Sequence, residues 1–329
     1  MVRTTKIQNT DVPFKLADSH MWEGLFNLLV VYLVWGSTYL AIRIAVREGS
    51  GFPPFLMGAS RTAIGGFLLL LWAKKKVERL KLSRREFFLL TLMGSMLWIG
   101  GNGIVNWSEQ RIHSAYAALL VASTPLWVAV IESFVDRRTP SFVLIGSLLL
   151  GFCGTGFLSY PVFASGVHAD ILSIVALFFA SLSWGGGSLL QRRLGMHLGA
   201  RATAGYQQIF AVPGFLIMSY VSGEPQPMPL PSAWLAFAYL VVFGSVLAIY
   251  SFTRAMQILP TKVVFTYSYV NPMIALFLGW VILSEPITGW TLLGASMIIL
   301  GVGGVFIEGQ RKRLHDPDDE EKSSTNKTT

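Results

Sequence analysis

Ten runs of mostly apolar residues, each long enough to cross a bilayer as a helix, divide nearly the whole chain. A hydrocarbon core about 30 Å thick needs about 20 such residues. The runs are residues 24–46, 54–73, 87–107, 114–135, 142–161, 169–190, 202–221, 233–253, 260–283 and 288–308. Only 13% of the 329 residues are charged, against about 25% in soluble proteins. The sequence therefore predicts an all-α integral membrane protein with ten transmembrane helices.

Lysine and arginine gather in every second loop. Residues 74–86 hold seven basic residues, whereas Arg47 and Arg111 are the only ones in the loops of the other side. Cytoplasmic loops carry such an excess, so the net charge of +8 does not indicate nucleic acid. We expect a multi-pass protein of the cell (inner) membrane with both termini cytoplasmic. Residues 1–23 are then a cytoplasmic N-terminal segment, and the polar residues 309–329 a disordered cytoplasmic tail.

The second half of the chain repeats the pattern of the first. A shift of 147 residues places Pro125 on Pro272 and brings the surrounding apolar runs into register. Each half, residues 24–161 and residues 169–308, contains five runs, and an odd number means that the second half enters the membrane from the opposite face. Inverted repeats of this kind are typical of secondary transporters, whose substrate site lies near the midplane where the repeats meet. We therefore expect two inverted five-helix repeats.

Pro125 and Pro272 each interrupt a long apolar run near its middle. Proline lacks a backbone N–H and frees the carbonyl four residues back, here that of Val121 and that of Ser268. A membrane tolerates a free carbonyl only where protein or water satisfies it. The two prolines predict either helix breaks beside a polar cavity between the halves, or packing kinks that neighbouring helices satisfy.

Four stretches carry a more specific signal: WGSTYLAIR, ASRTAIGGFLLLL, the segment from GNGIVNWSEQ to AALLVASTPLWVAV, and SYVNPMIALFLGWVILSEPIT. Together they resemble the ten-helix EamA-type branch of the drug/metabolite transporter superfamily, over nearly the whole chain. The resemblance implies two five-helix bundles around a central cavity, transport of small metabolites, and function as a monomer. It also implies importance at Arg61, a position at which the family often has arginine.

Ionisable residues inside membrane spans are functional candidates. Arg61 lies deepest, whereas Arg43 and Glu109 lie near the outer edge. Two interpretations stay open: a structural pair of Arg61 or Arg43 with Glu109, or an arginine that meets a substrate carboxylate. No aspartate or glutamate lies at mid-depth, which favours facilitated movement or exchange over carboxylate-coupled proton antiport, although a coupling role for Glu109 stays open.

Neutral polar and aromatic residues recur inside the runs, and we expect a set of them to line the cavity. The set is Trp35, Ser37, Thr38, Asn102, Asn106, Ser123, Trp184, Tyr250, Tyr267 and Asn271. Each residue alone is equally compatible with helix–helix contacts. As a set they suit an amphipathic solute such as an amino acid better than a phosphate, which needs clustered lysine or arginine.

These patterns predict a secondary transporter, an exporter of small organic metabolites such as amino acids or related amphipathic compounds, that works by alternating access. The five histidines show no metal-ligand spacing, and the chain lacks the phosphate-binding lysine motif of ATPases, so we expect neither metal nor cofactor. The expected partners are a small-molecule substrate and membrane lipid. The alternative is an integral-membrane enzyme or a scramblase that acts on lipid-linked substrates.

Overall fold

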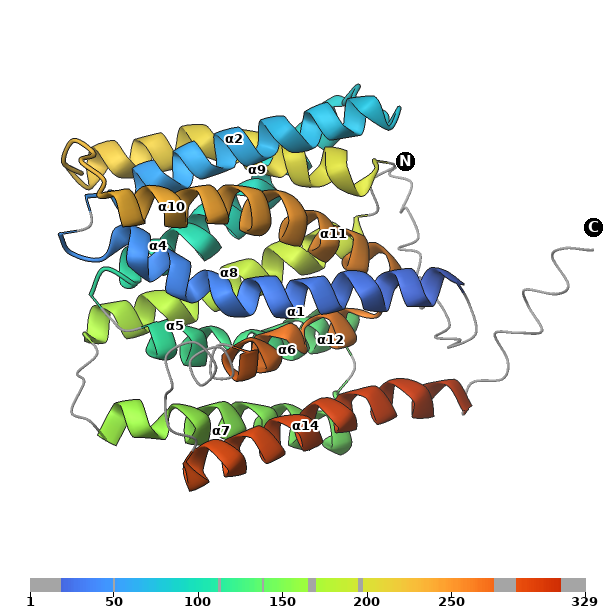
Figure 1. Ribbon diagram of the computed structural model, residues 1–329. Helices are drawn as coiled ribbons and strands as arrows, with labels where there is room; N and C mark the ends of the chain where they lie inside the picture. Colours follow the sequence, from blue (N-terminus) through green and yellow to red (C-terminus); the bar gives the residue numbers. More distant parts are fainter. Residues whose placement is uncertain are drawn as a thin grey trace, which may run out of the picture.

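The computed structural model describes residues 19–49, 51–111, 114–137, 139–164, 170–194, 198–274 and 288–314. Regular structure within these ranges is entirely helical, and the axes of the helices lie roughly parallel in one bundle (Figure 1). The α-helices are α1 (Ser19–Val46), α2 (Pro54–Lys75), α3 (Arg84–Gly94), α4 (Ile104–Ser108), α5 (Ser114–Val121), α6 (Thr124–Asp136), α7 (Phe142–Ala164), α8 (Ile171–Arg193), α9 (Ala200–Val221), α10 (Pro231–Tyr239), α11 (Ile249–Ile258), α12 (Thr261–Val264) and α14 (Gly289–Leu314). Two π-helices, η1 (Ser95–Gly103) and η2 (Leu240–Ala248), and helical residues 267–274 complete the set.

Six stretches are long and apolar enough to cross a membrane: Ser19–Val46, Pro54–Lys75, Arg84–Ser108, Ala117–Asp136, Ile171–Arg193 and Pro231–Ile258. Shorter apolar stretches, Phe142–Phe157 and Leu292–Glu308, belong to α7 and α14. These eight stretches coincide with eight of the predicted runs, and α9 coincides with a ninth. The chain is therefore a multi-pass helical membrane protein, while the count of ten stays a prediction.

Two of the long stretches change from α-helix to π-helix in the middle. The π-helix η1 joins α3 to α4, and η2 joins α10 to α11; each contains nine residues. These wider turns bond residue i to residue i+5 and are frequent at functional sites. They lie in the third and eighth predicted runs, which are corresponding runs of the two halves.

Two helix pairs form opposite edges of the bundle, α2 with α9 and α7 with α14 (Figure 1). Glycines allow the second pair to approach closely. A Cβ atom on Gly301 of α14 would lie 2.7 Å from the carbonyl oxygen of Ser147 in α7. Between the edges, α1 packs on α10, η2 and α11, while α8 packs on η1. The first run thus packs on the eighth and the sixth on the third, a pattern that agrees with two related halves.

Two glutamates link the halves in a reciprocal way. Glu224 follows α9 and accepts hydrogen bonds from the backbone N–H groups of Phe55 (2.8 Å) and Leu56 (2.9 Å), in the first turn of α2. Glu78 follows α2 and accepts a hydrogen bond of 3.1 Å from the N–H of Ala202, in the first turn of α9. Each carboxylate satisfies N–H groups that have no partner within their own helix and lies at the positive end of a helix dipole. The loop after each helix of this pair therefore caps the start of the other.

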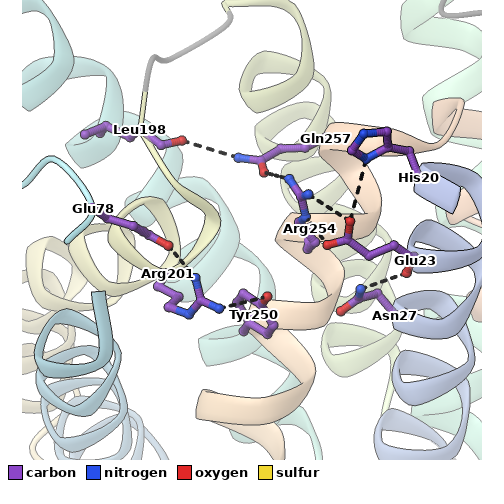
Figure 2. Close-up of polar contacts among 9 residues, drawn as sticks. All are labelled: His20, Glu23, Asn27, Glu78, Leu198, Arg201, Tyr250, Arg254 and Gln257. Atoms are coloured by element: carbon purple, nitrogen blue, oxygen red, sulfur yellow. Dashed lines mark hydrogen bonds and ion pairs between the residues drawn. The ribbon is translucent and has the colours of Figure 1, made fainter. Parts of the chain in front are cut away.

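One end of the bundle carries ion pairs (Figure 2). Arg254 of α11 donates from Nε to Glu23 of α1 at 2.6 Å, and Arg201 of α9 donates from Nη1 to Glu78 at 2.6 Å. The guanidinium of Arg201 also lies 4.4 Å from the centre of the Trp72 ring. Helix α1 begins and α14 ends at this same end (Figure 1). Its location in the cytoplasm remains a prediction from the basic loops.

The predicted end segments differ in extent from the structure. Helix α1 already begins at Ser19, and α14 continues to Leu314, so residues 309–314 are helical where we expected disorder. Apolar periodicity does not reach these residues, but a helix already in progress continues into them at little cost. Residues 1–18 and 315–329, the remainder of both predicted segments, lie outside the described ranges.

The fourth predicted run is broken into two helices just before its proline. Ala122 and Ser123 form a turn between α5 and α6, and Pro125 lies in the first turn of α6, where its missing N–H costs nothing. The hydroxyl of Thr124 donates to the carbonyl of Val121 at 2.6 Å. The carbonyl that we expected the proline to free is thus satisfied within its own segment.

The break in the ninth run does not lie at Pro272, so that prediction was wrong in position. Residues 267–274 remain helical through Pro272, and the turn lies earlier, at Phe265 and Thr266. The hydroxyl of Thr266 donates to the carbonyl of Val263 at 2.6 Å. In both halves, therefore, a threonine hydroxyl at the turn donates to the carbonyl three residues back.

Candidate functional site

A cavity of about 70 Å³ lies among α1, α2, η1, α8 and residues 267–274. The lining residues are Trp35, Thr38, Tyr39, Ile42, Arg61, Trp98, Gly101, Asn102, Val105, Val121, Ala180, Trp184, Tyr267 and Asn271. Seven of them, Trp35, Thr38, Arg61, Asn102, Trp184, Tyr267 and Asn271, are site residues predicted from the sequence. Both halves of the chain contribute to the lining.

Arg61 enters the cavity from α2 and is only 2% exposed. Its Nε donates to the hydroxyl of Ser245 on η2 at 2.6 Å, and its Nη1 donates to Oδ1 of Asn102 on η1 at 3.3 Å. The guanidinium lies 5.6 Å from the centre of the Trp98 ring. Among the residues that the structure describes, no carboxylate forms an ion pair with Arg61. The pair with Glu109 considered from the sequence is therefore not formed.

Trp35 is the centre of an aromatic wall. Its ring centre lies 5.4 Å from that of Trp184 and 4.9 Å from that of Tyr267, both in edge-on geometry. Phe252 of α11 packs on Trp35 at 5.1 Å. Edge-on contacts of this kind stabilise aromatic pairs beyond the area they bury. The aromatic wall is therefore a well-packed, mostly apolar surface beside the buried guanidinium of Arg61.

Three buried polar atoms of cavity-lining residues have no hydrogen-bond partner in the described part of the chain. They are Nε1 of Trp98 and Nε1 of Trp184, both donors, and Oδ1 of Asn271, an acceptor. Buried polar groups nearly always have a partner. These atoms are therefore available to a bound solute or to water.

Two of the predicted serines form hydrogen bonds outside the cavity. The hydroxyl of Ser37 is hydrogen-bonded to that of Tyr239 on α10. The hydroxyl of Ser123 donates to the carbonyl of Leu120 at 2.6 Å, within the turn between α5 and α6. Neither lines the cavity. Both serines stabilise contacts within the bundle.

Two further predicted residues also lie away from the cavity lining. The ring of Tyr250 lies 4.8 Å from the guanidinium of Arg201, at the end of the bundle that carries the ion pairs (Figure 2). Asn106 of α4 is completely buried, and neither atom of its amide has a partner among the described residues. The structure thus separates Tyr250 and Asn106 from the other predicted site residues.

Arg43 and Glu109 are neighbours, but not through the carboxylate. Nη1 of Arg43 donates to the backbone carbonyls of Glu109 and Gln110, the latter at 3.0 Å. The Glu109 side chain is completely buried, and neither carboxyl oxygen has a hydrogen-bond partner within the described ranges. Glu109 directly follows the span Arg84–Ser108; burial raises the pKa of its carboxyl well above the ordinary value, against a smaller lowering by the Arg43 charge.

A second hollow, of about 330 Å³, lies at the end of the bundle where α1 ends and α2 begins. It is lined by residues 46–49, 51–54 and 222–226 together with Trp107, Gln110 and Arg111. We call it the outer hollow, because the charge pattern predicts that this end faces away from the cytoplasm.

Tyr39, Trp98 and Ser245 contribute to the site but were not predicted from the sequence. Tyr39 lies one turn after Trp35 on α1, so the helical period contained a signal for it. Trp98 was visible only as one of many aromatic residues. Nothing in the sequence near Ser245 indicates its role, because that role depends on a contact with Arg61, far away in the chain.

The fold and the cavity define a helical membrane protein with a polar site buried between its two halves. The model of the EamA-like transporter family matches residues 22–160 and again residues 171–307. The chain therefore belongs to the EamA-like transporter family. It is a multi-pass membrane transporter, and nothing in this membership points to an enzyme.

Relatives of known description agree with the family. The chain is 29% identical over 277 residues to the uncharacterized inner membrane transporter YedA of Escherichia coli, covering 84% of this chain and 88% of YedA. It is 25% identical to the uncharacterized transporter YoaV of Bacillus subtilis, with 86% and 96% covered. It is 22% identical to an S-adenosylmethionine/S-adenosylhomocysteine transporter of Chlamydia trachomatis, with 88% and 90% covered. The description of YedA as an inner membrane transporter supports a location in the inner membrane.

A solved structure, described as the crystal structure of a protein, has the same fold. It aligns with a TM-score of 0.70 at 20% identity and covers 87% of this chain and 98% of its own.

Proposed function

We propose that this chain is a secondary transporter that exports small organic metabolites with a carboxylate group, such as amino acids and related amphipathic compounds. One observation carries the proposal: the guanidinium of Arg61 is buried beside the cavity without an acidic partner among the described residues. An unpaired buried charge is costly. A substrate carboxylate would supply the missing partner, in the fork geometry that arginine favours.

The remainder of the cavity fits such a solute. The aromatic wall around Trp35 suits an apolar side chain, and the free donor of Trp98 and the free acceptor of Asn271 suit its polar groups. A relative with 22% identity is named as a transporter of S-adenosylmethionine and S-adenosylhomocysteine, both of which are amino-acid derivatives. The cavity lining and this relative both favour amino acids and their derivatives as substrates.

The mechanism that we propose is alternating access between two inverted five-helix repeats, residues 24–161 and 169–308, with both termini in the cytoplasm. The reciprocal glutamate caps and the matched π-helices support the repeats. A cavity of about 70 Å³ has room for only a few water molecules. Substrate binding therefore requires the cavity to widen toward one side of the membrane. The transporter would work as a monomer surrounded by lipid.

The test is exchange of radiolabelled zwitterionic amino acids and S-adenosylmethionine in proteoliposomes without nucleotide. We expect exchange by the wild type and a loss of about tenfold or more in Arg61→Gln, since a lost charge-assisted hydrogen bond costs about 1.5–3 kcal/mol. Arg61→Lys should also lose flux, because an ammonium does not reproduce the planar fork. The matched control is Arg84→Gln, at an exposed arginine in the first turn of α3.

Two outcomes would contradict the proposal. Undiminished exchange in Arg61→Gln would remove Arg61 from the substrate site. Movement of a fluorescent phospholipid between leaflets, with no amino-acid exchange, would favour the scramblase alternative.

A further inference from the structure

Glu109 lies between the two hollows of the molecule. Asn102 and Val105 line the central cavity, whereas Gln110 and Arg111 line the outer hollow. The N–H of Glu109 donates to the carbonyl of Val105 at 2.9 Å, so Glu109 lies one helical turn beyond the central cavity. It therefore belongs to the layer of protein that separates the two spaces.

The carboxyl group of Glu109 is enclosed in this layer. It is completely buried, and both of its oxygens lack a hydrogen-bond partner among the described residues. Arg43, the cation that acts electrostatically on this carboxyl, directs Nη1 to backbone carbonyls and not to the carboxyl. A charged carboxylate without a partner is strongly disfavoured in such a place, whereas the neutral acid is tolerated. The arrangement described here therefore suits the protonated form.

The other titratable groups around Glu109 do not favour the charged form of its carboxyl enough to change its expected protonation. From α1, Arg43 and Tyr39 interact electrostatically with the carboxyl. From α2, Arg61 is already bonded to side chains of both π-helices. Asp170 directly precedes α8, and its carboxylate accepts hydrogen bonds from the backbone N–H groups of Leu172 and Ser173 in the first turn of that helix. The π-helix η1 contains no titratable residue.

We propose that Glu109 is the proton-binding residue of this transporter and that its proton is exchanged for substrate. The proposal rests on the proposed function. When the outer hollow opens toward the carboxylate, water delivers a proton, and the neutral acid is then buried as the layer closes. When the central cavity opens toward the cytoplasm, the O–H bond releases this proton to water. The empty transporter returns toward the cytoplasm only with the neutral acid, and bound substrate replaces the proton on the outward step, so one proton enters for each substrate that leaves.

The first test needs no substrate. Dicyclohexylcarbodiimide modifies protonated carboxyl groups in apolar surroundings. We expect mass spectrometry of the full-length protein in lipid vesicles to find Glu109 modified at neutral pH, and several-fold less at alkaline pH as the carboxyl loses its proton. The exposed Glu48 should remain unmodified at both. Absence of modification at Glu109, or modification that does not change with pH, would overturn the proposal.

The second test separates coupling from transport. Vesicles loaded with radiolabelled S-adenosylmethionine and zwitterionic amino acids should release them several-fold faster when the external medium is acid. Glu109→Gln should lose this response and retain exchange at equal pH, whereas Glu109→Asp should retain a response at shifted pH. Asp136→Asn, at an exposed carboxylate at the end of α6, should behave as the wild type.

The outcomes distinguish the two proposals. The proton site would be wrong if the rate of wild-type exchange does not depend on the pH gradient, or if Glu109→Gln still responds to the gradient. Neither result would contradict the proposed function. Absence of any exchange by the wild type would count against the proposed function itself, while the carbodiimide result still decides whether Glu109 carries a proton.

Discussion

Arg61 has its position because a residue on the neighbouring π-helix lacks a side chain. A Cβ atom on Gly244 would lie 2.8 Å from Nη2 of Arg61. The next residue, Ser245, holds Nε of Arg61 at 2.6 Å. The same turn of η2 therefore makes room for the guanidinium and fixes its direction.

Gly244→Ala should displace Arg61 without unfolding the protein, because the contact is with the far end of a flexible side chain. We expect KM for amino-acid efflux to rise several-fold, since the substrate carboxylate would no longer meet the guanidinium in its fork geometry. Efflux kinetics in proteoliposomes measure this change. The control is Gly146→Ala, where the added Cβ has no neighbour within 4 Å. An unchanged KM in Gly244→Ala would contradict the assigned contact.

Residues that line the cavity could be predicted from the sequence where they lie on a regular α-helix. Trp35 and Thr38 lie three positions apart on α1 and do line one cavity. Asn106 was selected because an α-helix places it beside Asn102, but Asn102 belongs to a π-helix, whose wider turn changes which residues share a face. The isolation of Glu109 depends on residues of other helices, so no local pattern reports it.

At the scale of elements, the reciprocal caps were the main feature that the sequence analysis missed. Glu78 and Glu224 are one residue off the 147-residue shift that relates the halves, so the duplication itself contained the signal. It was overlooked because a glutamate in a loop ordinarily faces solvent. The π-helices were not predictable in this way, because no residue pattern in the runs 87–107 and 233–253 separates them from α-helix.

Glu224→Gln should destabilise the protein, since it removes the negative charge at the start of α2 and one of two equivalent acceptor oxygens. We expect a loss of about 1 kcal/mol, the usual value of a helix cap together with its dipole interaction. Thermal unfolding in detergent should show a lower Tm than that of the wild type. Glu48→Gln, at an exposed site, is the matched control. Equal Tm values for the two variants would mean that the cap contributes nothing.

At the scale of the whole molecule, hydropathy predicted the architecture well, because a bilayer permits few alternatives to helices that satisfy their own backbone. The apolar runs 24–46 and 54–73 coincide with α1 and α2, and the basic loops gave an orientation. The cavity's size and the pairing of helices across the bundle could not be read in this way, because both depend on contacts between distant runs.

The predicted orientation can be tested with new cysteines, because the chain has a single one, Cys153. In a Cys153→Ser background, Lys81→Cys and Gln226→Cys change exposed loop residues after α2 and after α9. We expect a membrane-impermeant maleimide to label Lys81→Cys only in inside-out vesicles and Gln226→Cys only in right-side-out vesicles. Labelling of both from one side would refute the inverted arrangement.

The exchange of caps between α2 and α9 has a consequence for biosynthesis. When the ribosome has completed the first half, α2 is already in the membrane, yet the acid that completes its first turn, Glu224, has not been translated. The early half must therefore wait in an unfinished form until α9, the second span of the later half, has been inserted and Glu224 has followed it. Assembly of this transporter thus does not proceed one half at a time.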